Sequence, residues 1–107
     1  MSAEAIRELN DQLRVNDRNG RIVITSGILN VGGDFVVRAR EAVRAFNAFD
    51  EDNDPNGEHD FGSLVIDGYR LMFKIDYYDL QCEFGSPDPS NAAVTTRVMT
   101  ILLAEEY

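Results

Sequence analysis

Apolar residues recur at helical spacing near the start of the chain. Ile6, Leu9 and Leu13 share one stripe, and charged residues occupy most of the positions between them. Ser2 can cap the first turn, and a cluster of turn residues follows Val15. The pattern predicts an amphipathic helix that begins after Ser2 and ends near Val15.

A second stretch predicts the main helix of the protein, over residues 34–48. Asp34 can cap its start, and the small side chains of Ala39 and Ala42 allow close packing on a sheet. The apolar face comprises Phe35, Val36, Ala39, Ala42, Val43, Phe46 and Phe49. We expect this helix to be the central element of the hydrophobic core.

Alternation of apolar and polar residues after residue 60 predicts antiparallel strands. Asp67-Gly68 is typical of a two-residue type I′ turn, because both positions of that turn need positive φ. The turn sets a register that pairs Ile66 with Tyr69, Leu64 with Leu71 and Gly62 with Phe73. In this register the bulky side chains share one face of the hairpin.

A second tight turn at Asp79-Leu80 would extend the hairpin into a three-stranded meander. It would place Tyr77 opposite Cys82 and Ile75 opposite Phe84, which again keeps apolar side chains on one face. Cys82 would then point into the core as an inert thiol.

Two further segments complete the predicted sheet. Residues 21–25 are rich in β-branched side chains, and residues 92–104 fit both a helix and a strand, with their Thr and Ile content favouring a strand. We therefore predict an α+β fold with two helices and a four- to five-stranded antiparallel sheet packed around the helix 34–48. We expect a single domain spanning residues 1–107.

The composition is typical of a folded protein of the reducing cytoplasm. Hydrophobic residues make up 44% of the 107 residues, which argues against disorder. No stretch approaches the roughly 20 apolar residues of a membrane span, and the N-terminus lacks the features of a secretion signal. A single cysteine cannot form an internal disulfide. We expect a cytoplasmic monomer that does not bind membranes.

Negative charge is concentrated in the second half of the chain. The net charge is −9, yet residues 1–48 carry seven arginines and six acids, whereas residues 49–107 carry three basic and thirteen acidic side chains. Six of these acids and the only histidine lie between residues 49 and 62, where Pro55 and Gly57 argue against a helix. Such a surface repels nucleic acid and attracts basic proteins.

The acidic stretch predicts a surface that presents carboxylates in place of DNA phosphates. A DNA-binding groove is lined with Lys and Arg, and a rigid protein with carboxylates at comparable intervals can occupy it. We expect the partner to be a basic DNA-binding protein, and we expect no direct binding of nucleic acid. The predicted partner-binding residues are Asp50, Glu51, Asp52, Asp54, Glu58 and Asp60, extended by Asp76 and Asp79 if the meander lies alongside.

Calcium binding is an alternative function for the same stretch. Asp52, Asp54 and Asn56 match positions 1, 3 and 5 of an EF-hand loop, and Glu58 and Asp60 follow at positions 7 and 9. Position 12, however, is a serine in place of the bidentate Glu. A third alternative is a solvated loop in a purely structural accessory protein.

Catalytic motifs are not apparent. One histidine and one cysteine cannot supply the usual ligands of a zinc site, and no serine lies in a nucleophile elbow. The glycines do not form a phosphate-binding or dinucleotide-binding loop. We therefore expect no enzyme and no cofactor, and we interpret His59 as a hydrogen-bonding residue that holds the acidic stretch in place.

Five runs of residues carry a resemblance to a known family. They are Asp54–Gly62, Lys74–Asp79, Phe84–Pro89, Thr96–Ile101 and Glu106-Tyr107. They resemble a family of small acidic bacterial proteins of unknown function, associated with plasmids and other mobile elements. The resemblance covers nearly the whole chain from the first helix onward and implies no catalytic residues. It implies a setting in which small acidic proteins inhibit host defence. An anti-CRISPR role follows, in which a subunit of a CRISPR surveillance complex is the partner and its binding of target DNA is blocked.

Overall fold

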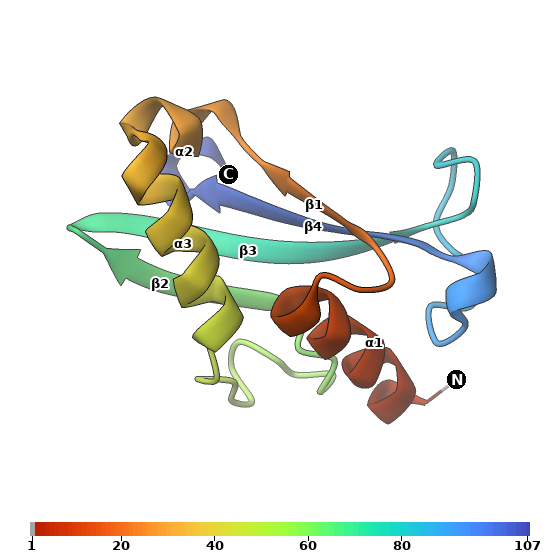
Figure 1. Cartoon of the computed structure of the whole chain (residues 1–107). Helices are drawn as coiled ribbons and strands as arrows, with labels where there is room; N and C mark the ends of the chain where they lie inside the picture. The colour runs from red at the N-terminus through yellow and green to blue at the C-terminus, as the bar shows by residue number, and fades with distance from the viewer. Residues whose placement is uncertain (1) are drawn as a thin grey trace.

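The computed structural model describes residues 2–107 as three helices and a four-stranded sheet (Figure 1). In chain order the elements are α1 (Ala3–Asn16), β1 (Arg21–Ile24), α2 (Ser26–Val31), α3 (Gly33–Ala45), β2 (Phe61–Ile66), β3 (Tyr69–Tyr78), the short 3-10 helix η1 (Ala92–Val94), β4 (Thr96–Leu103) and the 3-10 helix η2 (Ala104–Glu106). The fold is α+β, as predicted.

Helix α1 begins and ends where its capping residues require. The Ser2 side chain accepts a hydrogen bond from the Ala5 N–H at 3.4 Å, which satisfies one of the donors at the N-terminus of the helix. Asp17 ends the helix in the left-handed conformation with φ of 59°; its N–H donates to the carbonyl of Leu13 at 3.0 Å, and the N–H of Arg18 donates to the carbonyl of Gln12 at 3.1 Å. The predicted helix near the N-terminus is thus confirmed.

Helices α2 and α3 correct the prediction in two details. α3 begins after Gly32 rather than after Asp34. It ends at Ala45, three residues before the end of the predicted helix 34–48. The six-residue helix α2 was not predicted, because its apolar residues are too few to show a period. It packs beside α3 and β4.

The hairpin of β2 and β3 has the predicted register. Ile66 pairs with Tyr69 and Leu64 with Leu71, and Asp67 and Gly68 both adopt positive φ in the turn. A Cβ at Gly62 would lie 2.3 Å from the ring of Phe73, so the ring of Phe73 packs over this glycine. Turn chemistry and the hydrophobic pattern therefore agree, as expected of a local element.

The sheet is mixed rather than purely antiparallel. Its strand order is β1-β4-β3-β2; β4 pairs antiparallel with β3, and β1 pairs parallel with β4. Strand β4 lies between β1 and β3; Arg97, Met99, Ile101 and Leu103 on its inward face are buried, and Leu102 is the buried residue of its other face. The prediction of a strand within residues 92–104 is confirmed, and the all-antiparallel sheet was wrong.

The predicted third strand of the meander does not exist. After β3 the chain leaves the sheet, and β4 takes the position that the residues after Asp79 were expected to fill. Residues 85–89 include a glycine and two prolines, which disfavour a central strand. Cys82 and Phe84 are consequently exposed, and the prediction of an inward-pointing thiol at Cys82 was wrong.

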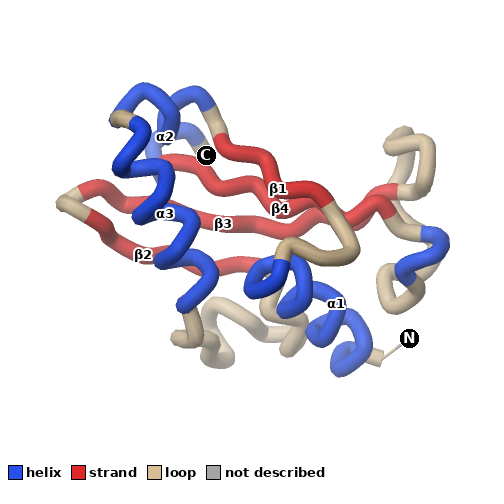
Figure 2. The backbone as a smooth tube through the Cα atoms, viewed as in Figure 1, coloured by secondary structure: helices blue, strands red, loops and turns tan. Residues whose placement is uncertain are grey.

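The helices α1 and α3 lie in front of the sheet in Figure 2 and cover one of its faces. The core between these layers comprises Leu13, Ile28, Phe35, Ala39, Val43, Leu71, Phe73, Ile75, Met99, Ile101 and Leu103. Of the strand residues with the opposite parity, Val23 and Val65 are exposed, whereas Leu102 is buried. None of the helices within residues 2–107 is long and apolar enough to cross a membrane.

Candidate functional site

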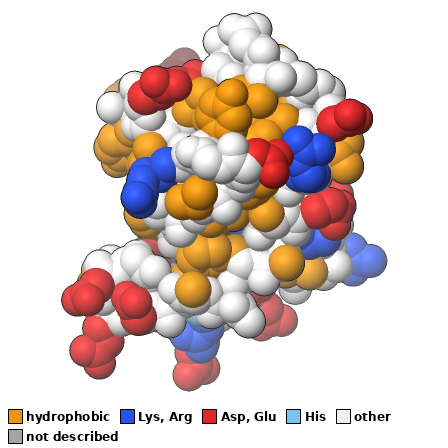
Figure 3. Space-filling model, turned by 90° about the vertical axis from the view of Figure 1, so that its left-hand side faces the viewer, with side chains coloured by type: hydrophobic (Ala, Val, Ile, Leu, Met, Phe, Trp, Pro, Cys, Tyr) orange, Lys and Arg blue, Asp and Glu red, His pale blue; other side chains and the backbone are white. Residues whose placement is uncertain are grey.

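The acidic loop, which we define as residues 46–60, connects α3 to β2 and runs past α1 at the lower edge of the molecule (Figure 1). In Figure 3, which is turned about the vertical axis, acidic side chains project from the same lower edge. The position of the acidic loop depends on α1, because side chains of this helix hold both ends of the loop.

Arg14 of α1 holds the start of the loop. Its guanidinium donates to the carbonyls of Val43, Arg44 and Phe46 at 3.1, 3.1 and 2.7 Å, and only 6% of its side chain is exposed. These carbonyls lie at the end of α3, where the last carbonyls of a helix lack intrahelical donors; the Val43 carbonyl also accepts from the N–H of Phe46 at 3.3 Å. Arg14 thereby ends α3 and directs the chain across the bottom of the sheet.

The first half of the acidic loop is a compact turn closed by Asp50 and Asn53. The Asp50 carboxylate accepts from the N–H groups of Asp52 and Asn53 at 2.9 and 3.0 Å. Asn53 in return donates to the carbonyl of Ala48 at 2.8 Å. Such side-chain bonds to the local backbone fix a turn without regular secondary structure. Glu51 and Asp52 are therefore exposed on a rigid support.

The second half of the loop is organised around Asp54, whose side chain is only 5% exposed. One carboxylate oxygen accepts from the N–H groups of Glu58 and His59 at 3.0 and 3.1 Å. Gly57 and His59 both have positive φ, so this is a tight turn wrapped around a buried carboxylate. Asp54 is a structural residue and presents little charge to a partner.

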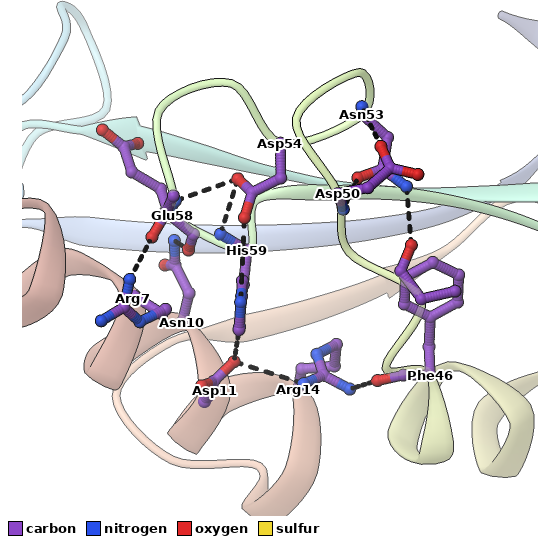
Figure 4. Close-up of polar contacts among 12 residues, drawn as sticks. Arg7, Asn10, Asp11, Arg14, Phe46, Asp50, Asn53, Asp54, Glu58 and His59 are labelled. Atoms are coloured by element: carbon purple, nitrogen blue, oxygen red, sulfur yellow. Dashed lines mark hydrogen bonds and ion pairs between the residues drawn. The ribbon is translucent and has the colours of Figure 1, made fainter.

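His59 fastens the loop to α1 (Figure 4). Its Nδ1 lies 2.9 Å from a carboxylate oxygen of Asp11, and its Nε2 lies 3.7 Å from Asp54. The imidazole also stacks on the ring of Phe49 with 3.9 Å between centroids and an interplanar angle of 5°. The interpretation of His59 as a hydrogen-bonding residue that holds the loop is therefore confirmed.

A polar network joins the loop to α1 and to the end of the sheet. Arg7 donates to the carbonyl of Gly57 at 3.0 Å, and Asn10 donates to the carbonyl of Glu58 at 2.9 Å and to the hydroxyl of Tyr77 at 2.8 Å. The Tyr77 hydroxyl donates to the Glu58 carboxylate at 2.8 Å. Burial, and then the Glu58 carboxylate, raise the pKa of Tyr77.

Arg97 lies at the centre of this network and is completely buried. Its Nε donates to Asn10 at 2.7 Å and its Nη2 to the carbonyl of Pro89, and its guanidinium lies 5.2 Å from the ring centroid of Tyr77. Its Nη1 has no hydrogen-bond partner within residues 2–107. Burial lowers the pKa of Arg97, opposed by Tyr77 and Glu58.

The sequence contained a signal for this network that the prediction missed. Arg97 shares the inward parity of Met99 and Ile101 on β4, and Asn10 shares the apolar stripe of Ile6 and Leu13 on α1. A polar residue at a core position is informative, because burial requires that it find partners.

The acids at the end of the loop lie close together. Burial raises the pKa of Asp60, and the nearby negative charges of Glu58, Asp54 and Asp76 raise it further. Asp76 itself forms an ion pair with Lys74 at 2.7 Å. The structure thus brings these four predicted residues together at the junction of the loop with β2 and β3.

Asp79 lies apart from the other predicted residues, in the turn that follows β3. Its carboxylate accepts from the N–H of Glu83 at 3.0 Å. The predicted extension of the acidic row along a meander edge therefore includes Asp76 but not Asp79, because the meander is absent.

Helix α1 contributes acids that the sequence prediction missed. Glu4 and Glu8 are exposed, and the Asp11 side chain is 39% exposed. The contacts of Arg7, Asn10 and Asp11 place this helix against residues 57–59 of the acidic loop. We define the acidic face as the combined set Glu4, Glu8, Asp11, Asp50, Glu51, Asp52, Glu58, Asp60 and Asp76.

The geometry does not favour the calcium alternative. Within residues 2–107 no group of three or more His, Cys, Asp or Glu side chains is arranged to hold a metal ion. Asp54, which would be the ligand at position 3 of the loop, accepts from the backbone N–H groups of Glu58 and His59. Asp52 and Asn56 are exposed.

Comparison with models of known protein families identifies the family of this chain. A family model described as "Protein of unknown function (DUF3768)" matches residues 24–106. The chain belongs to the DUF3768 family. The DUF3768 match includes the acidic loop and β2 to β4, whereas α1, which holds the loop, precedes it. No curated protein and no solved structure matches the chain.

Proposed function

We propose that this DUF3768 protein inhibits a bacterial nucleic-acid-binding defence complex, such as a CRISPR surveillance complex. In this role its acidic face occupies the basic groove that binds target DNA, and carboxylates replace phosphates there. The protein acts in the cytoplasm of the host cell as an accessory protein of a plasmid or another mobile element. It catalyses no reaction and requires no cofactor.

The observation that carries this proposal is the rigid support of the exposed carboxylates Glu51 and Asp52. They stand on a turn closed by Asp50 and Asn53 and lie in the loop that His59 fastens to α1. Groups that are already ordered lose little conformational entropy on binding, so their electrostatic attraction contributes more fully to affinity. A solvated acidic loop would not need this support.

The arginines of α3 also favour the proposal, because they do not neutralise the acidic face. Arg38 pairs with Asp67, and Arg40 and Arg44 pair with Asp17 at the end of α1. The negative charge of the loop is therefore directed to solvent, where it can attract a cationic partner.

A mobility-shift assay tests the proposal. A purified Cascade-type complex is mixed with labelled target duplex and increasing amounts of the full-length protein. We expect the protein to displace the duplex, and its affinity for the complex to fall by about tenfold or more between about 50 and about 200 mM salt. The variant Glu51→Lys/Asp52→Lys should lose inhibition, because it reverses two exposed charges of the turn.

The matched control is Asp34→Lys/Glu105→Lys, which changes the net charge equally at exposed sites on α3 and η2. It should inhibit as the unmodified protein does. Equal loss of inhibition in both variants would reduce the effect to net charge alone. If the unmodified protein leaves the DNA complex intact at low salt, CRISPR inhibition is refuted. Immobilised protein and nuclease-treated bacterial lysate, eluted with duplex DNA, then test for another DNA-binding partner.

A further inference from the structure

The turn after β3 is a defined structure rather than a loose loop. We call residues 79–84 the tip; it extends beyond the end of the sheet at the right of Figure 1. The Asp79 N–H donates to the Phe84 carbonyl at 2.8 Å, and the Cys82 N–H donates to the Asp79 carbonyl at 3.0 Å. A bridge between Tyr78 and Gly85 closes its base. The tip is thus held by its own backbone.

The tip exposes large apolar side chains. Phe84 is 72% exposed and Leu80 is 58% exposed, and the Cys82 thiol between them is also exposed. The backbone bonds across the turn keep these side chains away from the core. An aromatic side chain that is exposed to water contributes strongly to the free energy of binding when a partner buries it. Aromatic residues are accordingly enriched in protein interfaces.

The charge around the tip limits the kind of partner that can cover it. From residue 75 to residue 96 the chain contains four acids, Asp76, Asp79, Glu83 and Asp88, and no Lys, Arg or His. A second copy of the chain carries the same net charge of −9, and nucleic acid and anionic membranes are also negative, so each of these would be repelled from the tip. The complementary partner is a basic protein.

We propose that Leu80 and Phe84 insert into an apolar pocket flanked by Lys and Arg residues on a protein partner. The identity of that partner, a basic nucleic-acid-binding protein, is taken from the proposed function, and the inference rests on it in this respect. The two surfaces have different roles: the acidic face accelerates association, and the buried apolar contact slows dissociation.

The experiment uses Cys82 as a natural attachment point, because it is the only cysteine of the chain. The full-length protein is labelled there with benzophenone maleimide, mixed with nuclease-treated bacterial lysate and irradiated, and the cross-linked peptide is identified by mass spectrometry. The matched control carries Cys82→Ser and Val37→Cys, which moves the label to an exposed site on α3, where Val37 is 63% exposed.

We expect the label at Cys82 to yield an adduct with one bacterial protein, on an apolar peptide with Lys or Arg nearby. Phe84→Ser should lower its yield by about tenfold or more, Leu80→Ser should lower it less, and the label on α3 should not form it. Circular dichroism checks that each variant remains folded. An adduct between two copies of the chain, equal yields from both labels, no adduct, or a yield unchanged by Phe84→Ser would overturn the inference.

The charge variant Glu51→Lys/Asp52→Lys separates this inference from the proposed function. If it lowers the adduct yield and Phe84→Ser does not, the apolar contact is refuted and the electrostatic proposal stands. If Phe84→Ser removes the adduct and the charge variant leaves it unchanged, the acidic face is not the binding surface and the apolar contact stands.

Discussion

The acidic loop and the segment 79–95 are both long connections rich in acids and turn residues, but they are held in different ways. The acidic loop is fastened by side chains of α1, among them Arg7, Asn10 and Arg14. The segment 79–95 is held largely by its own groups, for example by the 2.7 Å hydrogen bond between the hydroxyls of Ser86 and Thr95.

Because of this difference, the number of acids in a segment does not by itself give the negative charge that the segment exposes to solvent. In the acidic loop, Asp54 is buried as an acceptor for backbone N–H groups, whereas Glu51 and Asp52 have no such task and are exposed. In the segment 79–95, the exposed side chains include the large apolar residues Leu80 and Phe84. Variants of the two segments should therefore differ in their effects on stability.

Arg14→Ala should have the largest effect, because it removes the donors that hold the end of α3 and the start of the acidic loop. We expect the free energy of unfolding to fall by about 3 kcal/mol, since three carbonyls lose a charged donor. Urea unfolding measures the change. Arg18→Ala, at an exposed position just after α1, is the control and should change stability by less than about 0.5 kcal/mol. Equal effects of the two variants would contradict the role of Arg14.

Asp54→Ala should lower the free energy of unfolding by about 2 kcal/mol, because the N–H groups of Glu58 and His59 lose their acceptor in a partly buried turn. Asp52→Ala, in the exposed half of the same loop, should change it by less than about 0.5 kcal/mol. Thermal unfolding with and without Ca²⁺ measures the stability of both variants and any effect of calcium. Stabilisation of the unmodified protein by Ca²⁺ would revive the calcium alternative.

Asp60→Asn should increase stability near neutral pH, by roughly 0.5 kcal/mol. The folded pKa of Asp60 is raised above the ordinary value of 3.8, so its ionisation opposes folding. The contribution of protonated Asp60 to stability is fully present below the pKa that Asp60 has in the unfolded chain. It is lost as pH rises through the higher pKa that Asp60 has in the folded protein. The stability difference between the variant and the unmodified protein should therefore vanish as pH falls below about 4. A difference that is independent of pH would exclude repulsion among these acids as the cause.

Phe84→Ser should have the smallest effect on folding, because 72% of Phe84 is exposed in the folded protein. We expect a change of less than about 0.5 kcal/mol in the free energy of unfolding, measured by urea titration. A loss above about 2 kcal/mol would show that the tip packs against the fold and would remove the contrast between the two segments.

Local chemistry explains which parts of the fold were predictable. Asp67-Gly68 sets the hairpin register by its own backbone preference, and the apolar period of α3 identifies the helix without knowledge of its partners. The expected turn at Asp79-Leu80 was wrong because alternation alone cannot tell whether a strand leaves the sheet. The burial of Asp54 was equally hidden, since a buried and an exposed carboxylate have the same sequence signature.

The sequence by itself determined the two longer helices, the hairpin and the concentration of negative charge, because periodicity, turn chemistry and composition are local properties. Only the tertiary structure decided that β1 pairs parallel with β4 and that α1 holds the acidic loop. It also decided which acids remain exposed. These features depend on contacts between residues far apart in the chain, such as Asn10 with Arg97, and they form only when the helices pack on the sheet and buried polar groups must find partners.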